Sequence, residues 1–155
     1  MLEMSGQTSL IAAAVVLVGL ITLGFFVREG IVTSSLYNQA VKLYQEKDFQ
    51  SAEATLQNVL SRHPSNDIAR LLLGESLMQL GKLDDATSQF NHLISRSPKN
   101  ADAHLRLATA LMKQEKLENA IAAFTKAKDL FLKQRNLSKA EQIEQLLQQL
   151  NNNRV

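Results

Sequence analysis

The sequence predicts an all-α protein: an N-terminal transmembrane helix, then a solenoid of three helical repeats, then a C-terminal capping helix. Three observations predict this class: a run without charge near the N-terminus, a spacing of 34 residues that recurs along the chain, and an amphipathic final segment. The composition agrees. Apolar residues make up 45% of the 155 residues, aromatic residues only 5%, and there are two prolines, which favours packed helices over sheets.

After a short tail at residues 1–9, the stretch 10–27 reads "LIAAAVVLVGLITLGFFV" and carries no charge. As a helix it spans about 27 Å, close to the ~30 Å hydrocarbon core of a bilayer. The alternatives are a cleaved signal peptide and a buried helix. A signal peptide usually begins with Lys or Arg and ends in small residues, whereas here no Lys or Arg precedes the run and its end, "FFVREG", is a poor cleavage site.

The stretch 10–27 therefore predicts an uncleaved transmembrane helix that contacts the lipid bilayer, and a single-pass membrane protein. Arg28, Lys42 and Lys47 follow the run. By the positive-inside rule they favour the cytoplasmic (or stromal) side for the rest of the chain. Residues 28–32 are expected to be a linker.

The 34-residue spacing defines the solenoid. Pro64 and Pro98 are 34 residues apart, and five further columns keep the same interval. These columns are Ala52, Ala86 and Ala120; Leu56, Phe90 and Phe124; Ala40, Gly74 and Ala108; Leu43, Leu77 and Leu111; Phe49, Leu83 and Leu117. Such a period indicates a stacked supersecondary unit. It predicts three repeats, at 33–66, 67–100 and 101–134.

Within each repeat the pattern predicts a helix, a turn and a second helix. In the second repeat, Gly74 allows a neighbouring helix to approach closely, Gly81 suits a helix end and Asp84 can cap the next helix. Pro98 then stops the second helix, and Asn100 can cap the helix that follows.

These repeats resemble the tetratricopeptide repeat (TPR) family over residues 33–134. The residues that carry the resemblance are Leu36, Ala40, Leu43, Ala52, Leu56 and Pro64; Leu73, Gly74, Leu77, Gly81, Ala86, Phe90 and Pro98; Leu107, Ala108, Leu111, Ala120, Phe124 and Ala127. Two features depart from the family pattern. The Trp expected early in the first helix is replaced by Arg70 and His104, and Leu132 stands where the third repeat would close with Pro, which predicts a helix that runs on.

The segment 135–150 has one apolar face, formed by Leu137, Ala140, Ile143, Leu147 and Leu150. Ser138 and Glu141 have the spacing of a capping box. A solenoid needs a terminal helix with a polar outer face. This segment is therefore predicted to be the capping helix, followed by a flexible tail at 151–155.

The sequence offers no site for catalysis. Cysteine is absent, which excludes thiolate metal sites and thiol nucleophiles. His63, His92 and His104 do not form a zinc-binding spacing, and no glycine-rich phosphate loop is present. The net charge of +2, with Lys and Glu interspersed, gives no basic stripe for nucleic acid. We expect no enzyme activity, cofactor, metal, nucleic acid or small-molecule substrate.

The resemblance implies that the first helices of the repeats form a concave groove that binds other proteins. Carried over to this sequence, the groove residues are Tyr37, Val41, Tyr44, Leu72, Glu75, Met78, Arg106, Thr109 and Met112. Leu71 and Leu105 lie in the same columns, where packing between helices is an equal alternative. One TPR subtype clamps the carboxylate tails of chaperones; at its positions this chain has Tyr37, Val41, Leu72, Asp102 and Arg106, and only Arg106 keeps the expected type.

These observations predict a membrane-tethered scaffold or assembly factor for a membrane protein complex, such as a photosystem or a cytochrome, with subunits of that complex as partners. The alternatives are a permanent accessory subunit of a large membrane complex and an envelope protein associated with chaperones.

Overall fold

The computed structural model describes the backbone of residues 3–152 and the side chains of residues 14–28 and 34–152. The described residues form seven helices and no strand. The helices are α1 (Glu3–Gln45), α2 (Phe49–Arg62), α3 (Asp67–Gln79), α4 (Leu83–Arg96), α5 (Ala101–Lys113), α6 (Leu117–Lys133) and α7 (Leu137–Asn152). The all-α class predicted from the sequence is confirmed.

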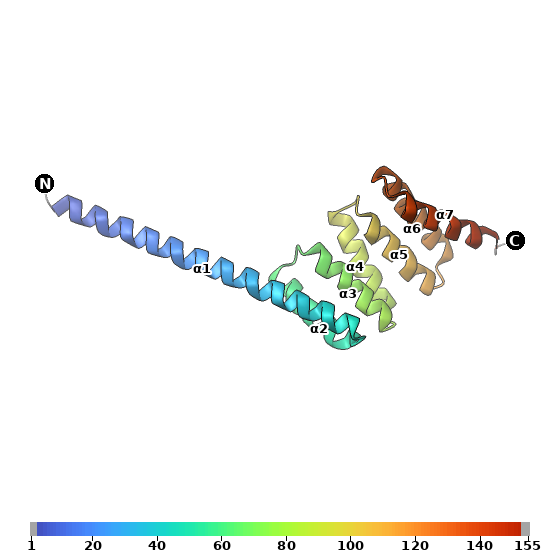
Figure 1. The fold of residues 1–155 in the computed structure, drawn as a ribbon, viewed down its shortest axis with the longest axis horizontal. Coiled ribbons are helices and arrows are strands. Elements are labelled where there is room, and N and C mark those ends of the chain that lie inside the picture. The colour runs from blue at the N-terminus through green and yellow to red at the C-terminus, as the bar shows by residue number, and fades with distance from the viewer. Residues whose placement is uncertain (1–2, 153–155) are drawn as a thin grey trace.

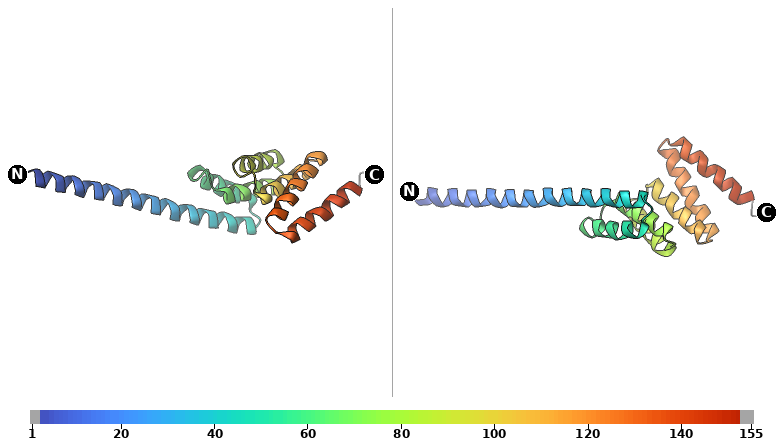
Figure 2. Two further views of the ribbon diagram at one scale, coloured as in Figure 1. Left: turned by 90° about the horizontal axis from the view of Figure 1, so that it is seen from above. Right: turned by 60° about the horizontal axis from the view of Figure 1, so that its bottom comes forward.

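The N-terminal helix is one continuous element of 43 residues. It extends through residues 28–32, which were expected to be a linker. Its C-terminal part lies beside α2, whereas its N-terminal part runs out from the packed helices as a rod (Figures 1 and 2). The large apolar side chains along the rod, from Val15 to Val27, are 54–72% exposed.

The predicted transmembrane helix at residues 10–27 is corrected by the structure. Over the part of the chain that the structure describes, no helix is long and apolar enough to cross a membrane. Residues 10–13 lie outside the described side chains. The predicted bilayer contact, single-pass topology and membrane orientation are contradicted with it.

The helices pair as α1 with α2, α3 with α4 and α5 with α6, in antiparallel hairpins (Figure 1). Each hairpin turn contains one residue in the left-handed region: Lys47, Gly81 and Glu115 have φ of 63°, 74° and 60°. The same turn joins α6 to α7, where Arg135 has φ of 59°. Only the second hairpin has glycine at this position, where a positive φ is free of strain.

Polar side chains form hydrogen bonds in the loops that join the hairpins, between α2 and α3 and between α4 and α5. Asn66 and Asn100 are the N-caps of α3 and α5, each accepting a hydrogen bond from the backbone N–H three residues on, at 3.0 Å. The residues that replace the family's Trp also have a structural use. Arg70 Nη2 donates to the carbonyl of Pro64 at 2.9 Å, and His104 Nε2 donates to the carbonyl of Pro98 at 3.1 Å.

Small residues allow the paired helices to approach closely, as the repeat pattern predicted. Gly74 lies against the ring of Phe90, which is fully buried, and a Cβ at Gly74 would stand 2.6 Å from Phe90 Cζ. The core continues through Leu56, Leu77 and Phe124 at 0–3% exposure. Burial of the columns thus explains why the spacing recurs.

Two predicted caps are wrong. Asp84 lies inside the first turn of α4, which begins at Leu83, and Lys82 at the cap position makes no side-chain cap bond. Asp84 instead accepts a hydrogen bond from Gln114 at 2.9 Å. At α7 the cap is Asn136, whose Oδ1 accepts from the N–H of Lys139 at 3.2 Å, so Ser138 is already helical.

The third repeat ends as the missing proline predicted. With Leu132 in place of Pro, α6 continues to Lys133. Helix α7 then packs on α6 through Ala140, Ile143 and Leu147. Of the predicted tail, residues 151–152 end α7, and 153–155 lie outside the described residues.

Candidate functional site

The nine residues predicted to line a partner-binding groove come from three helices. Tyr37, Val41 and Tyr44 belong to α1, Leu72, Glu75 and Met78 to α3, and Arg106, Thr109 and Met112 to α5. Helix α3 contacts both α1 and α5. We call the surface formed by these residues the first-helix face.

The structure brings three of the nine, Tyr44, Glu75 and Arg106, together in a polar cluster that joins the three helices. Arg106 Nε lies 2.6 Å from Glu75 Oε1, in an ion pair whose N–H is not aligned for a hydrogen bond. A hydrogen bond with the Glu75 carboxylate is among the causes that raise the pKa of Tyr44. The side chain of Glu75 is 16% exposed and that of Arg106 is 43% exposed, so the carboxylate is the more buried member of the pair.

Glu75 and partial burial act on both tyrosines. The pKa of Tyr37 is raised above its usual value by desolvation and then by the negative charge of Glu75. The pKa of Tyr44 is raised by desolvation, by the charge of Glu75 and by the hydrogen bond to it, while Arg106 and a hydrogen bond with Gln79 act in the opposite direction. Both phenols therefore remain protonated at neutral pH, and Tyr44 can donate.

Apolar side chains flank this cluster. Tyr37 and Leu72 are half-buried and pack against the core of the first two repeats, and Met112 packs in the same way against the third. The ring of Tyr44 meets that of Phe49 edge to face at 5.3 Å, which fixes its position. The face thus offers partly exposed apolar surface around a fixed polar centre.

The remaining predicted residues differ in their availability. Val41 and Thr109 are half-buried, and the Thr109 hydroxyl donates to the carbonyl of Leu105 at 3.0 Å. Met78 is only 7% exposed and belongs to the core cluster. A partner that lies on the first-helix face would therefore reach little of Met78.

The sequence named the members of the cluster one by one but did not predict their pairing. Glu75 and Arg106 lie on adjacent first helices but not in the same 34-residue column, so their pairing cannot be read from the columns. Gln79 was missed altogether. Its position one turn after Glu75 on the same helix was the signal that would have found it.

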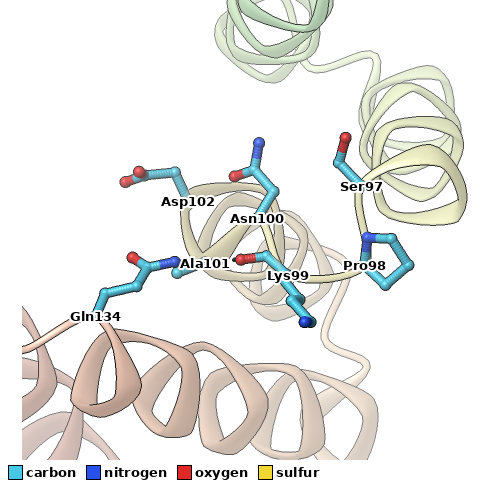
Figure 3. A pocket seen from close by; sticks show the side chains of 7 residues that line it. All are labelled: Ser97, Pro98, Lys99, Asn100, Ala101, Asp102 and Gln134. Atoms are coloured by element: carbon cyan, nitrogen blue, oxygen red, sulfur yellow. Dashed lines mark hydrogen bonds between the residues drawn. The ribbon is translucent and has the colours of Figure 1, made fainter.

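A depression lies at the loop between α4 and α5, away from the nine predicted residues (Figure 3). It is lined by Ser97, Pro98, Lys99, Asn100, Ala101, Asp102 and Gln134. Its polar side chains already have partners in the fold: Gln134 Nε2 donates to the carbonyl of Lys99 at 3.2 Å, Asp102 pairs with Lys139 at 2.7 Å, and Asn100 is the cap of α5. We assign it to loop packing.

The histidines lie apart from one another. His92 is exposed on α4, His63 is half-buried at the end of α2, and His104 is bonded to Pro98. Among the described residues, no three His, Cys, Asp or Glu side chains are grouped so as to hold a metal ion.

Solved structures from several sources share this fold. The translocator chaperone SycD of Yersinia enterocolitica type III secretion is 18% identical with a TM-score of 0.71, covering 75% of this chain and 87% of its own. PcrH, in complex with the chaperone-binding region of PopD, is 17% identical with a TM-score of 0.73, covering 79% and 92%. The TPR2B domain of yeast Sti1, in a complex with pHsp70, is 19% identical with a TM-score of 0.72, covering 78% and 97%.

At these identities the likeness shows the fold alone. No curated protein matches the sequence closely enough to count as a relative. Two family models, both described as tetratricopeptide repeat, match residues 43–95 and 73–131. Together with the helical hairpins, these matches show that residues 43–131 of this chain belong to the tetratricopeptide repeat family.

Proposed function

We propose that this chain is a protein-interaction scaffold that holds an apolar segment of a partner protein on its first-helix face. The observation that carries the proposal is the composition of that face. Tyr37, Leu72 and Met112 present partly exposed apolar surface, whereas the charges of Glu75 and Arg106 are paired with each other. A surface of aromatic and methionine side chains adapts to apolar partners with few specific polar demands.

The solved relatives in fold are consistent with this role. PcrH forms a complex with the chaperone-binding region of PopD, and domains of Sti1 form complexes with pHsp70 and pHsp90. These complexes agree with a role in binding other proteins and not in catalysis. The finer role predicted from the sequence, assembly of a membrane complex, depended on the anchor that the structure contradicts, so the proposal is limited to partner binding.

Selection of peptides tests this function directly. A display library of random peptides is selected on the intact chain, and the enriched peptides are measured against two variants. The first carries Tyr37→Glu and Leu72→Glu on the first-helix face. The matched control carries Ala54→Glu and Asn91→Glu, two exposed positions on α2 and α4.

The proposal expects apolar peptides whose affinity falls about tenfold or more, roughly 1.4 kcal/mol, in the first variant and is unchanged in the control. Equal binding by both variants would show that partners use another surface. Circular dichroism of both variants checks that each remains helical.

A further inference from the structure

We propose that Glu75 is a specificity-determining residue of the first-helix face: by pairing with Arg106, it makes the face select against partner segments that carry charge. This inference rests on the proposed function, since it concerns which segments the same face accepts. It assigns to the polar cluster a role in rejecting partners.

The Glu75 carboxylate neutralises Arg106, the residue that an acidic group on this face would bind. The carboxylate lies 2.6 Å from Arg106 Nε, so the two charges are paired with each other. Its low exposure, 16%, keeps it from turning away into solvent. Arg106 is the one residue that retains the type expected in the chaperone-tail clamp of the family, and its charge is already used.

A charged segment gains little on such a surface. An acidic group near Arg106 is repelled by the Glu75 carboxylate, and a basic group near Glu75 is repelled by the guanidinium. In either case the incoming ion loses its hydration without a free counter-charge to replace it. An apolar segment can cover the pair without breaking it. Repulsion of this kind is a common source of specificity.

Asp102, one turn before Arg106 on α5, is balanced as well. Asp102 is paired with Lys139 of α7 at 2.7 Å, and the Lys139 ammonium also lies 4.8 Å from the centre of the Phe131 ring. The charges of α5 at Asp102 and Arg106 therefore both have a partner within the fold. This agrees with a partner that contributes no net charge where it crosses α5.

Three versions of one peptide test the inference. A peptide selected on the intact chain is synthesised with Asn, Asp or Lys at one central position. The intact chain is expected to bind the Asn version roughly tenfold more tightly than either charged version. Glu75→Gln frees Arg106 and should bring the Asp version to at least the affinity of the Asn version. Arg106→Gln should shift the preference toward the Lys version instead.

The chain supplies a matched control. Glu53 pairs with Lys82 at 2.8 Å, and their side chains are 13% and 48% exposed, close to the values for Glu75 and Arg106. Glu53→Gln therefore removes the same carboxylate from an equally buried pair that involves none of the nine residues. It should leave the order of the three peptides unchanged. The double variant Glu75→Gln/Arg106→Gln should lose the preference for Asp.

The inference is overturned if Glu75→Gln keeps the order of the intact chain, or if Glu53→Gln shifts it equally. Failure of the proposed function has a different signature: the Tyr37→Glu/Leu72→Glu variant would then bind all three peptides as the intact chain does. Thermal unfolding of each variant, followed by circular dichroism, separates a change in preference from a loss of fold.

Discussion

Gly74 is the residue at which sequence, packing and stability are linked most directly. Its Cα lies against the ring of the fully buried Phe90, so a side chain of any size must displace that ring. We predict that Gly74→Ala lowers the free energy of unfolding by about 1–3 kcal/mol through overpacking. Urea unfolding followed by circular dichroism measures the change.

Gly19 gives the control for this prediction. It is also helical, but a Cβ there would meet nothing within 4 Å. Gly19→Ala should be neutral or stabilise the helix by up to about 1 kcal/mol. Equal destabilisation by the two substitutions would show that the contact with Phe90 is not the cause.

The raised pKa of Tyr44 makes the stability of the folded chain depend on pH in the alkaline range. Its pKa in the folded chain is raised by desolvation and by Glu75 above the value of about 10 for an exposed tyrosine. A raised pKa stabilises the folded state fully below pH 10, and this contribution is lost as the pH rises above it. We predict that the free energy of unfolding falls less steeply above pH 10 in Tyr44→Phe than in the intact chain. Urea unfolding at a series of alkaline pH values measures both slopes.

Glu75→Gln tests the cause of this dependence. Without the carboxylate, the pKa of Tyr44 should move down toward its usual value, as followed by the ultraviolet absorbance of the phenolate. An unchanged absorbance titration would mean that Glu75 does not act on Tyr44.

At the scale of the elements, the two helices of a repeat differ in their N-terminal caps. Helix α5 is capped by Asn100, whereas Lys116 at the start of α6 makes no side-chain cap bond. We predict that Asn100→Ala lowers the free energy of unfolding by about 1 kcal/mol, and that Lys116→Ala leaves it nearly unchanged. Thermal and urea unfolding of the two variants compare them. Similar losses in both would contradict the assigned caps.

The elements that the sequence predicted well are those fixed by short-range chemistry. The 34-residue columns located the helical hairpins, because Ala52, Ala86 and Ala120 are small where helices cross and are fully buried. Asn100 was predicted as a cap because Pro98 ends the preceding helix and Asn100 is a good cap for the helix that follows. Asp84 and Ser138 were mistaken for caps because each lies within two residues of the true start, at Lys82 and Asn136.

The features that could not be predicted from the sequence are contacts between residues that are far apart along the chain. The pair of Glu75 and Arg106 joins residues of different repeats, on α3 and α5, that do not share a 34-residue column. The hydrogen bonds of Arg70 and His104 to the carbonyls of Pro64 and Pro98 likewise require the loops to curl back. Neither relation follows from the spacing of residue types along one helix.

At the scale of the whole molecule, a rod and a solenoid share one helix. The C-terminal part of α1 is the first helix of the first repeat and carries Tyr37 and Tyr44, while its N-terminal part projects away from the repeats (Figure 1). The polar cluster then ties α1 to α3 and α5. A partner on the first-helix face would therefore contact the helix that also forms the rod.

The central claim is that partners bind the first-helix face. The most direct test is to map the amide chemical-shift changes that a selected peptide causes by nuclear magnetic resonance. We predict that the changes concentrate at Tyr37, Leu72, Arg106 and Met112, and that exposed positions of α2 and α4, such as Ala54 and Asn91, stay unchanged. Changes that cluster on α2 and α4 instead would contradict the proposed function.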